Sequence, residues 1–246
     1  MITRYWFLSI ASCCKRLTLS LQCSAAALLL LTVTSAGAQS TGLLYDPEPP
    51  ANSAYVRVIQ ASPEGPVDVL VDGKPRVQGL AGGAASDYLV LPSGKHSVAL
   101  RKTGQVAEVV SMDLDAISGR AFTVAFTGLK AGLKPLVFED KANSNKLKAV
   151  LAVYHLDARS GPLDVLTADS ATRVFAGLEP GASKTLSVNP IAIELIVAKS
   201  VETVPQAKVS LAMSQGGTYS ILLLTAAKGG VSAIALQNKV ERYTGK

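Results

Sequence analysis

The run Gly65-Pro66-Val67-Asp68-Val69-Leu70 returns 96 residues later as Gly161-Pro162-Leu163-Asp164-Val165-Leu166. A polar connection and a Gly-Leu pair follow each copy, Gly79-Leu80 in the first and Gly177-Leu178 in the second. The spacing between corresponding residues grows only from 96 to 98 over this stretch. Ordered self-similarity of this kind indicates that one fold is present twice in the chain.

The repeated unit has the residue pattern of β-structure. Val67, Val69 and Val71 alternate with Asp68, Leu70 and Asp72, as expected for a strand with two different faces. Seven short strands separated by Gly/Pro turns are predicted in the first half, and the second half repeats the pattern, without a convincing helical period. We therefore expect an all-β chain with two tandem β-sandwich (immunoglobulin-like) domains. The run Ile221–Leu224 is apolar on both faces, which predicts burial on both sides, or a face covered by the other domain or by a partner.

Domain boundaries follow from composition. Residues 1–38 resemble a signal peptide, with basic residues at Arg4, Lys15 and Arg16, an apolar segment, and small residues before a cleavage site after Ala38. The alternative is an uncleaved membrane anchor, but polar residues dilute the apolar segment. We then expect an extended N-terminal segment over 39–53, a first sandwich over 54–140, a linker over 141–147, a second sandwich over 148–238, and a frayed basic tail over 239–246.

Removal of the signal peptide changes the chemistry available to the chain. All three cysteines lie within it, so the mature chain would have no disulfide and no thiolate nucleophile or ligand. Without Arg4, Lys15 and Arg16, the 24 basic residues become 21 against 18 acidic residues, a net charge of +3. This weak charge argues against nucleic-acid binding and permits only modest attraction to an anionic polysaccharide.

No catalytic or metal-binding constellation is evident in the sequence. The two histidines, His96 and His155, are 59 residues apart in different domains, so we predict no metal site and no cofactor. Asp157 follows His155 closely, but no serine, Ser160 included, lies in a recognisable nucleophile turn. Asp68 and Asp164 recur in both copies, and we expect each to accept hydrogen bonds from the backbone of a neighbouring turn; contact with a ligand is the alternative.

The candidate contact residues for a partner or a glycan are few. Arg57 alternates against Val56 and Val58, so its side chain is predicted to project from the opposite face of its strand. Arg101 and Lys102 form a small basic group, and Tyr45 is the large residue of the extended N-terminal segment. These four residues are the predicted contact set; ordinary solvated surface is the alternative for the basic group.

The segment Leu44-Tyr45-Asp46-Pro47 is followed by Tyr55-Val56-Arg57-Val58. This order is similar to the opening of the periplasmic alginate O-acetylation accessory protein family, AlgF. Ala85-Ser86-Asp87-Tyr88, Leu91-Pro92-Ser93-Gly94 and Asn189-Pro190 continue the similarity in order, whereas the C-terminal tail matches only loosely.

The resemblance implies a periplasmic, non-catalytic adaptor for O-acetylation of an exopolysaccharide such as alginate. Its implied partners are periplasmic and membrane-associated acetyltransferase proteins, and it implies no catalytic residue set for this chain. Two alternatives stay open: a glycan-binding module that contacts the polysaccharide directly, and an enzyme. A glycan-binding module usually exposes an aromatic platform, whereas the tyrosines here are scattered along the sequence.

Overall fold

The computed structural model describes residues 48–128, 132–200 and 204–244, and these form two similar halves built from strands. The strands of the first half are β1 (Ser53–Gln60), β2 (Val67–Val71), β3 (Lys74–Leu80), β4 (Leu89–Pro92), β5 (Gly94–Lys102), β6 (Glu108–Ala116), β7 (Ala121–Thr127) and β8 (Lys134–Asp140). Those of the second half are β9 (Ala149–His155), β10 (Leu163–Thr167), β11 (Arg173–Leu178), β12 (Ser183–Val188), β13 (Ala192–Lys199), β14 (Pro205–Ala212), β15 (Thr218–Thr225) and β16 (Val231–Gln237). In the described ranges no helix is long and apolar enough to cross a membrane.

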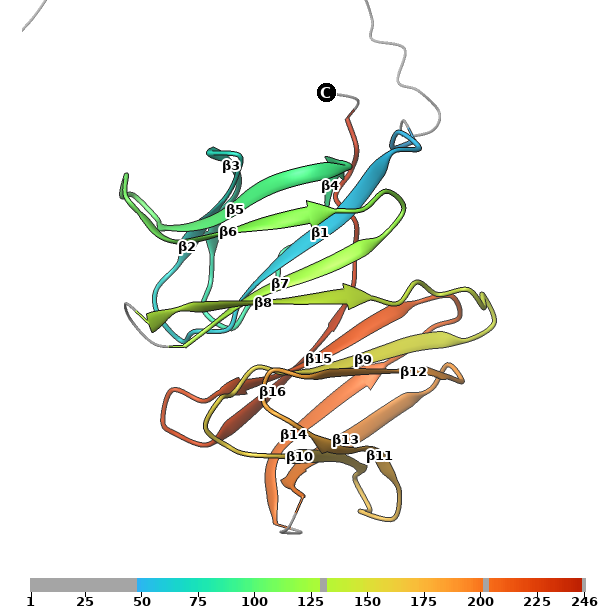
Figure 1. The fold of residues 1–246 in the computed structure, drawn as a ribbon. Helices are drawn as coiled ribbons and strands as arrows, with labels where there is room; N and C mark the ends of the chain where they lie inside the picture. Colours follow the sequence, from blue (N-terminus) through green and yellow to red (C-terminus); the bar gives the residue numbers. More distant parts are fainter. Residues whose placement is uncertain (1–47, 129–131, 201–203, 245–246) are drawn as a thin grey trace, which may run out of the picture. The chain divides into compact units, whose positions relative to one another are not determined.

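Each half is a sandwich of two four-stranded sheets (Figure 1). In the first half the strand orders are β4-β1-β7-β8 and β3-β2-β5-β6. In the second half they are β12-β9-β15-β16 and β11-β10-β13-β14, which is the same topology with each strand number raised by eight. Even the parallel pairing of β1 with β7 recurs, between β9 and β15. The predicted all-β repeat is therefore confirmed.

One strand of the first half was missed by the prediction of seven. Residues Lys74–Leu80 form β3, which pairs antiparallel with β2 through irregular register. The strand contains Pro75 and Gly79 and is exposed along most of its length. Its sequence therefore resembles a polar connection, because proline and glycine are tolerated in edge strands such as this one.

Each sandwich has its own aliphatic core. Alternate residues of β1 and β7, such as Val56, Val58 and Val124, point between the sheets of the first half. Leu151, Ile221 and Leu223 occupy the corresponding place in the second half. Strand alternation thus places one set of side chains in each core and leaves the other set on the outer face of the sheet.

A third apolar cluster joins the two halves, which are parts of one compact unit. It contains Ile59, Ala125 and Phe138 from the first half and Tyr154 and Leu222, among others, from the second. The rings of Phe138 and Tyr154 meet edge to face, with centroids 5.3 Å apart. The run Ile221–Leu224 is therefore buried on both faces because the first sandwich covers its outer face, as the sequence allowed.

The described part of the chain begins at residue 48 and includes most of the C-terminal tail. The predicted signal peptide and most of the extended N-terminal segment lie outside the described residues. The prediction of a frayed tail is wrong for residues 239–241, which run beside β4. The amide of Tyr88 donates to the carbonyl of Lys239 at 2.8 Å, and the amide of Glu241 donates to the carbonyl of Tyr88 at 2.9 Å. The C-terminal segment of the second half is thus hydrogen-bonded to the edge of the first.

Candidate functional site

Arg57 lies at the centre of the contact between the sandwiches. Strand alternation directs its side chain away from the first core, as predicted, but the second half covers that face and leaves the residue only 1% exposed. The guanidinium donates from Nε to Thr123 Oγ1 at 2.8 Å, from Nη1 to Asn238 Oδ1 at 2.7 Å and from Nη2 to Ser220 Oγ at 2.9 Å. It also lies over the rings of Tyr88 and Tyr154, at 4.8 and 5.3 Å from their centroids. A buried cation is thus held by both halves of the chain.

Asp140 supplies the corresponding anion at the end of β8. Its Oδ2 accepts from Tyr88 Oη at 2.8 Å and from Thr123 Oγ1 at 2.5 Å, and its Oδ1 accepts from Tyr154 Oη at 2.5 Å. Burial raises the pKa of both tyrosines, so they remain protonated donors at neutral pH. Thr123 links the guanidinium to the carboxylate, and the whole network spans the junction between the halves.

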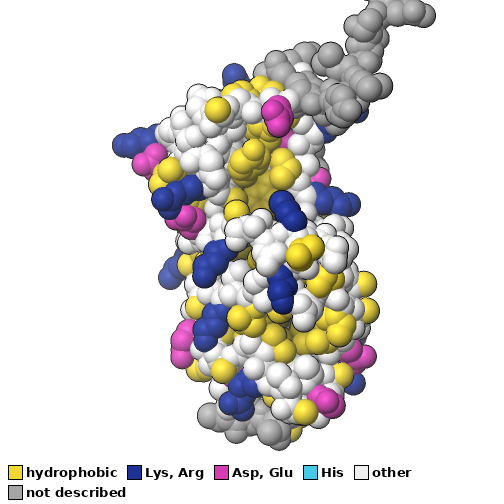
Figure 2. Space-filling view, turned by 90° about the vertical axis from the view of Figure 1, so that its right-hand side faces the viewer, with side chains coloured by type: hydrophobic (Ala, Val, Ile, Leu, Met, Phe, Trp, Pro, Cys, Tyr) yellow, Lys and Arg dark blue, Asp and Glu magenta, His cyan; other side chains and the backbone are white. Residues whose placement is uncertain are grey.

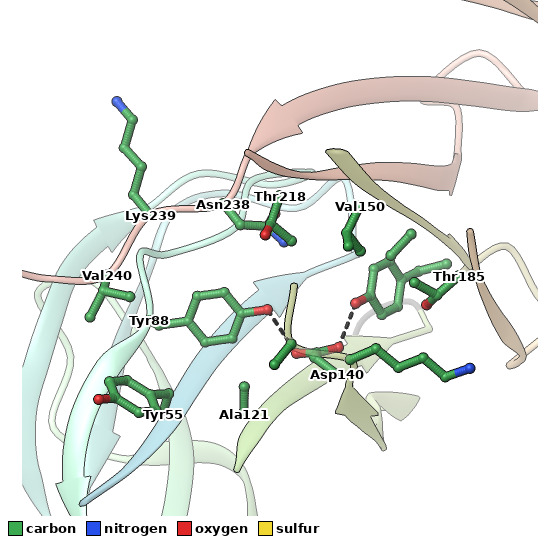
Figure 3. A pocket seen from close by; sticks show the side chains of 14 residues that line it. Tyr55, Tyr88, Ala121, Asp140, Val150, Thr185, Thr218, Asn238, Lys239 and Val240 are labelled. Carbon is green, nitrogen blue, oxygen red and sulfur yellow. Dashed lines mark hydrogen bonds between the residues drawn. The ribbon is translucent and has the colours of Figure 1, made fainter. Parts of the chain in front are cut away.

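A cleft of about 210 Å³ opens beside this network. Figure 3 shows Asp140 beside the ring of Tyr88, with Tyr55 and Val240 on one side and Val150 and Thr185 on another. Tyr154, whose hydroxyl also donates to Asp140, lines the same cleft. Both halves line the cleft, and its rim includes the exposed residues Lys141 and Lys239. Figure 2 shows a face of the molecule on which basic side chains are interspersed with hydrophobic ones, while acidic side chains lie mainly near the margins.

Of the four predicted contact residues, the structure describes three, and it separates Arg57 from Arg101 and Lys102. Tyr45 lies outside the described residues. Arg101 and Lys102 lie at the end of β5, in the sheet that does not face the second half. Arg101 Nη2 pairs with Asp68 Oδ2 at 3.1 Å, whereas Lys102 is exposed. Arg57 is therefore not brought together with the other basic candidates.

Each repeated aspartate accepts a backbone hydrogen bond, as expected, but the donor lies near the end of the paired strand, β3 or β11, and not in a turn. Asp68 Oδ1 accepts from the amide of Gly79 at 3.1 Å, and Asp164 Oδ1 accepts from the amide of Gly177 at 2.7 Å. A hydroxyl and an arginine complete each set: Thr103 and Arg101 for Asp68, Ser200 and Arg173 for Asp164. These bonds lower the pKa of Asp68, and they also lower that of Asp164 although burial alone would raise it. Each aspartate therefore fixes the irregular end of the strand that pairs with its own, β3 or β11.

His155 contacts a serine, but in a geometry that opposes catalysis. The ring is fully buried; Nε2 lies 2.8 Å from the carbonyl oxygen of Gly161 and 3.4 Å from Ser160 Oγ. A carbonyl only accepts, so Nε2 must carry the proton and cannot take one from the serine. Burial lowers the pKa of His155, which keeps the ring neutral. Asp157 bonds instead to Thr225 and to the amide of Arg159.

The first half contains the equivalent side-chain hydrogen bond to a glycine carbonyl, made by a different residue. Gln60 ends β1 as His155 ends β9, and its Nε2 donates to the carbonyl of Gly65 at 3.0 Å. Gly65 and Gly161 open the two copies of the repeat. His155 is therefore the counterpart of a glutamine whose amide closes the same turn, which indicates a structural role for the imidazole.

His96 binds acceptors through both ring nitrogens. Nδ1 lies 2.7 Å from Asp72 Oδ2, and Nε2 lies 2.8 Å from the carbonyl oxygen of Pro92. Burial lowers the pKa of His96, but the bonds to Asp72 and Pro92 outweigh that effect and raise it above its ordinary value. The ring thus connects the β2–β3 turn to the β4–β5 turn as a cation in acidic solution.

The sequence analysis did not identify Asp140, Tyr88, Tyr154 or Asn238 as members of a site. Asp140 borders a polar run that resembles a linker, and the tyrosines are isolated in the sequence. The one available signal was the apolar outer face of β15, which predicted a covering partner for this part of the fold.

A family model described as a domain of unknown function, DUF4397, matches residues 54–166, which span the first sandwich and the first two strands of the second. The alginate biosynthesis protein AlgF of Pseudomonas aeruginosa is 28% identical over 88% of this chain and 93% of its own. AlgF of Azotobacter vinelandii is 29% identical over 66% of this chain and 68% of its own. The solved C-terminal domain of P. aeruginosa AlgF aligns in full with 38% of this chain, at 19% identity and a TM-score of 0.32.

The chain is thus a tandem β-sandwich protein whose two halves share a buried polar junction. Its sequence similarity to AlgF extends over most of its length, and the resemblance to the AlgF family is confirmed.

Proposed function

We propose that this chain is a non-catalytic adaptor in alginate biosynthesis, exported to the periplasm by a signal peptide over residues 1–38. It would hold acetyltransferase proteins beside the exopolysaccharide that they modify. The relatives at 25–29% identity are named alginate biosynthesis proteins, which supports a role in that process. The basic and apolar leader described above supports export.

The non-catalytic part of the proposal is supported by how the reactive groups are used. His155 Nε2 is committed as a donor to Gly161, and His96 is held between two acceptors. Asp68 and Asp164 close turns in separate halves. Each of these groups stabilises a strand connection, so none is left to act as a general base on a substrate.

The observation that carries the adaptor proposal is the buried junction around Arg57. A guanidinium bonded to residues of both halves, together with the third apolar cluster, supports a fixed arrangement of the two sandwiches. A fixed arrangement is what a scaffold needs if it is to present two partners to one another. Direct glycan binding is less favoured, because Tyr88, Tyr154 and Tyr219 are buried and therefore do not form a stacking platform.

The proposal is tested by biolayer interferometry with the chain from residue 39 onward. The analytes are the purified periplasmic domains of alginate O-acetyltransferases from the same organism, and serum albumin is the control. Saturable binding of at least one acetyltransferase is expected, together with no hydrolysis of an acetyl-ester substrate above the buffer rate. Absence of binding to every acetyltransferase, or turnover of the ester that scales with protein concentration, would overturn the proposal.

A further inference from the structure

We propose that the cleft beside Asp140 is a docking pocket for one apolar side chain of a partner protein, in a segment that carries carboxylates next to that side chain. This inference rests on the proposed adaptor function and adds the place and the chemistry of the contact. It is carried by the size of the cleft, its lining, and the charges at its rim.

The size and lining of the cleft suit an apolar side chain. A cavity of about 150 Å³ lined by aliphatic residues is large enough for a benzene molecule, and this cleft measures about 210 Å³. Its walls include Ala121, Val150, Ala152 and Val240 and the rings of three tyrosines. An aromatic or leucine side chain would therefore bury its surface here without displacing the chain's own core, as the central residues of interface hot spots do.

The acidic and phenolic groups that line the cleft are already hydrogen-bonded within the protein. Asp140 accepts three hydrogen bonds, and two of the donors are the hydroxyls of Tyr88 and Tyr154. An inserted apolar group would leave these bonds intact. A sugar ring would bring several hydroxyls that need new partners, and the engaged carboxylate and tyrosines offer few.

The polar groups of the cleft without a hydrogen bond to another described residue can each donate one. Asn238 Oδ1 accepts from both Arg57 and Ser220, so its amide nitrogen is oriented away from them and is free to donate. Thr185 and Thr218 line the same cleft, and neither hydroxyl has a hydrogen bond to another described residue. These groups could bind the backbone carbonyls of an incoming segment.

The rim charges indicate the sign of the partner. Lys141 and Lys239 are exposed, and neither forms an ion pair with another described residue. The carboxylate that lines the cleft, Asp140, accepts hydrogen bonds from three hydroxyls, and one of them, Thr123 Oγ1, also accepts from Arg57. Carboxylates of a partner on either side of the inserted side chain would therefore meet two ammonium groups.

The test uses NMR titration of the isotope-labelled chain from residue 39 onward. The probe is N-acetyl-L-phenylalaninate, which combines an apolar ring with a carboxylate, and its carboxamide is the uncharged comparison. Saturable shifts are expected at the amides of Ala142, Val150 and Val240, with the acid binding about twofold to fivefold more tightly than the amide, the range of an exposed ion pair. Absence of saturable shifts at these residues would overturn the proposal. So would stronger binding of trimannuronate at the same residues, which would identify a glycan site instead.

Two variants and one control complete the test. Lys141→Glu combined with Lys239→Glu should abolish the preference for the acid over the amide, and Ala142→Trp at the exposed mouth should weaken both probes. Lys95→Glu, an exposed lysine on β5 in the sheet that does not face the second half, should change neither. Acetyltransferase binding is measured for the same proteins. If the cleft variants bind the acetyltransferase as tightly as the wild type does, the docking pocket is rejected and the adaptor function is kept. If the wild-type protein binds no acetyltransferase, the adaptor function itself is rejected.

Discussion

Replacement of Arg57 by methionine should lower the free energy of unfolding more than the same replacement of an exposed arginine does. Methionine keeps much of the apolar stem but removes three hydrogen bonds from a buried cation. Removal of one member of a buried charged network costs about 3–5 kcal/mol. The lower end, about 3 kcal/mol, is expected here, because Thr123 still bonds to Asp140 and Ser220 still bonds to Asn238.

The assay is urea denaturation of the chain from residue 39 onward, followed by circular dichroism. With a typical dependence of about 2–3 kcal/mol per molar urea, the midpoint should fall by about 1–1.5 M. Arg120→Met is the matched control, because Arg120 pairs with Glu139 at 2.6 Å but both side chains are half exposed; its cost should stay below about 1 kcal/mol. Equal midpoints for the Arg57 and Arg120 variants would refute the role assigned to the junction. A double-mutant cycle with Asp140→Asn should show a coupling of about 0.5–3 kcal/mol.

Three further predictions concern other parts of the fold. Leu222→Ala removes a fully buried side chain of the third cluster, so calorimetry should show a loss of about 2–5 kcal/mol; a loss below 1 kcal/mol would contradict burial by the other half. The raised pKa of His96 predicts that its bond to Asp72 stabilises the protein fully below about pH 6.5, the unfolded value, and that this contribution disappears as the pH rises through the folded pKa. His96→Gln should remove that dependence from the melting temperature, and an unchanged profile would disprove it. The lowered pKa of Asp164 predicts stability that is present above about pH 4 and lost as the pH falls through the folded pKa, and Asp164→Asn should flatten the acid limb of the urea-midpoint profile; an acid limb as steep as that of the wild type would contradict this assignment.

The sequence predicted the parts of the fold that depend on local pattern. The repeated Gly-Pro strand revealed the duplication. The recurring aspartates predicted backbone acceptors, although the donors Gly79 and Gly177 lie in the paired strands and not in turns. The strand β3 was missed because an exposed edge strand with proline and glycine has the composition of a loop.

The junction could not be predicted from the sequence, because its members are far apart in the chain. Arg57 bonds to residues 66, 163 and 181 positions away. Alternation predicted that its side chain would leave the first core, but alternation cannot distinguish a solvent-facing surface from one covered by another domain. Strand β15 is apolar on both faces, which indicated that its outer face is covered but not which surface covers it.

The most direct test of this account is the measurement of residual dipolar couplings for both sandwiches of the chain from residue 39 onward. The account predicts that the couplings of residues 53–140 and 149–237 fit one alignment tensor, because the Arg57 junction holds the halves in a fixed arrangement. Two tensors of different magnitude in the wild-type protein would show that the halves reorient independently, and would contradict the fixed scaffold from which the adaptor function is argued.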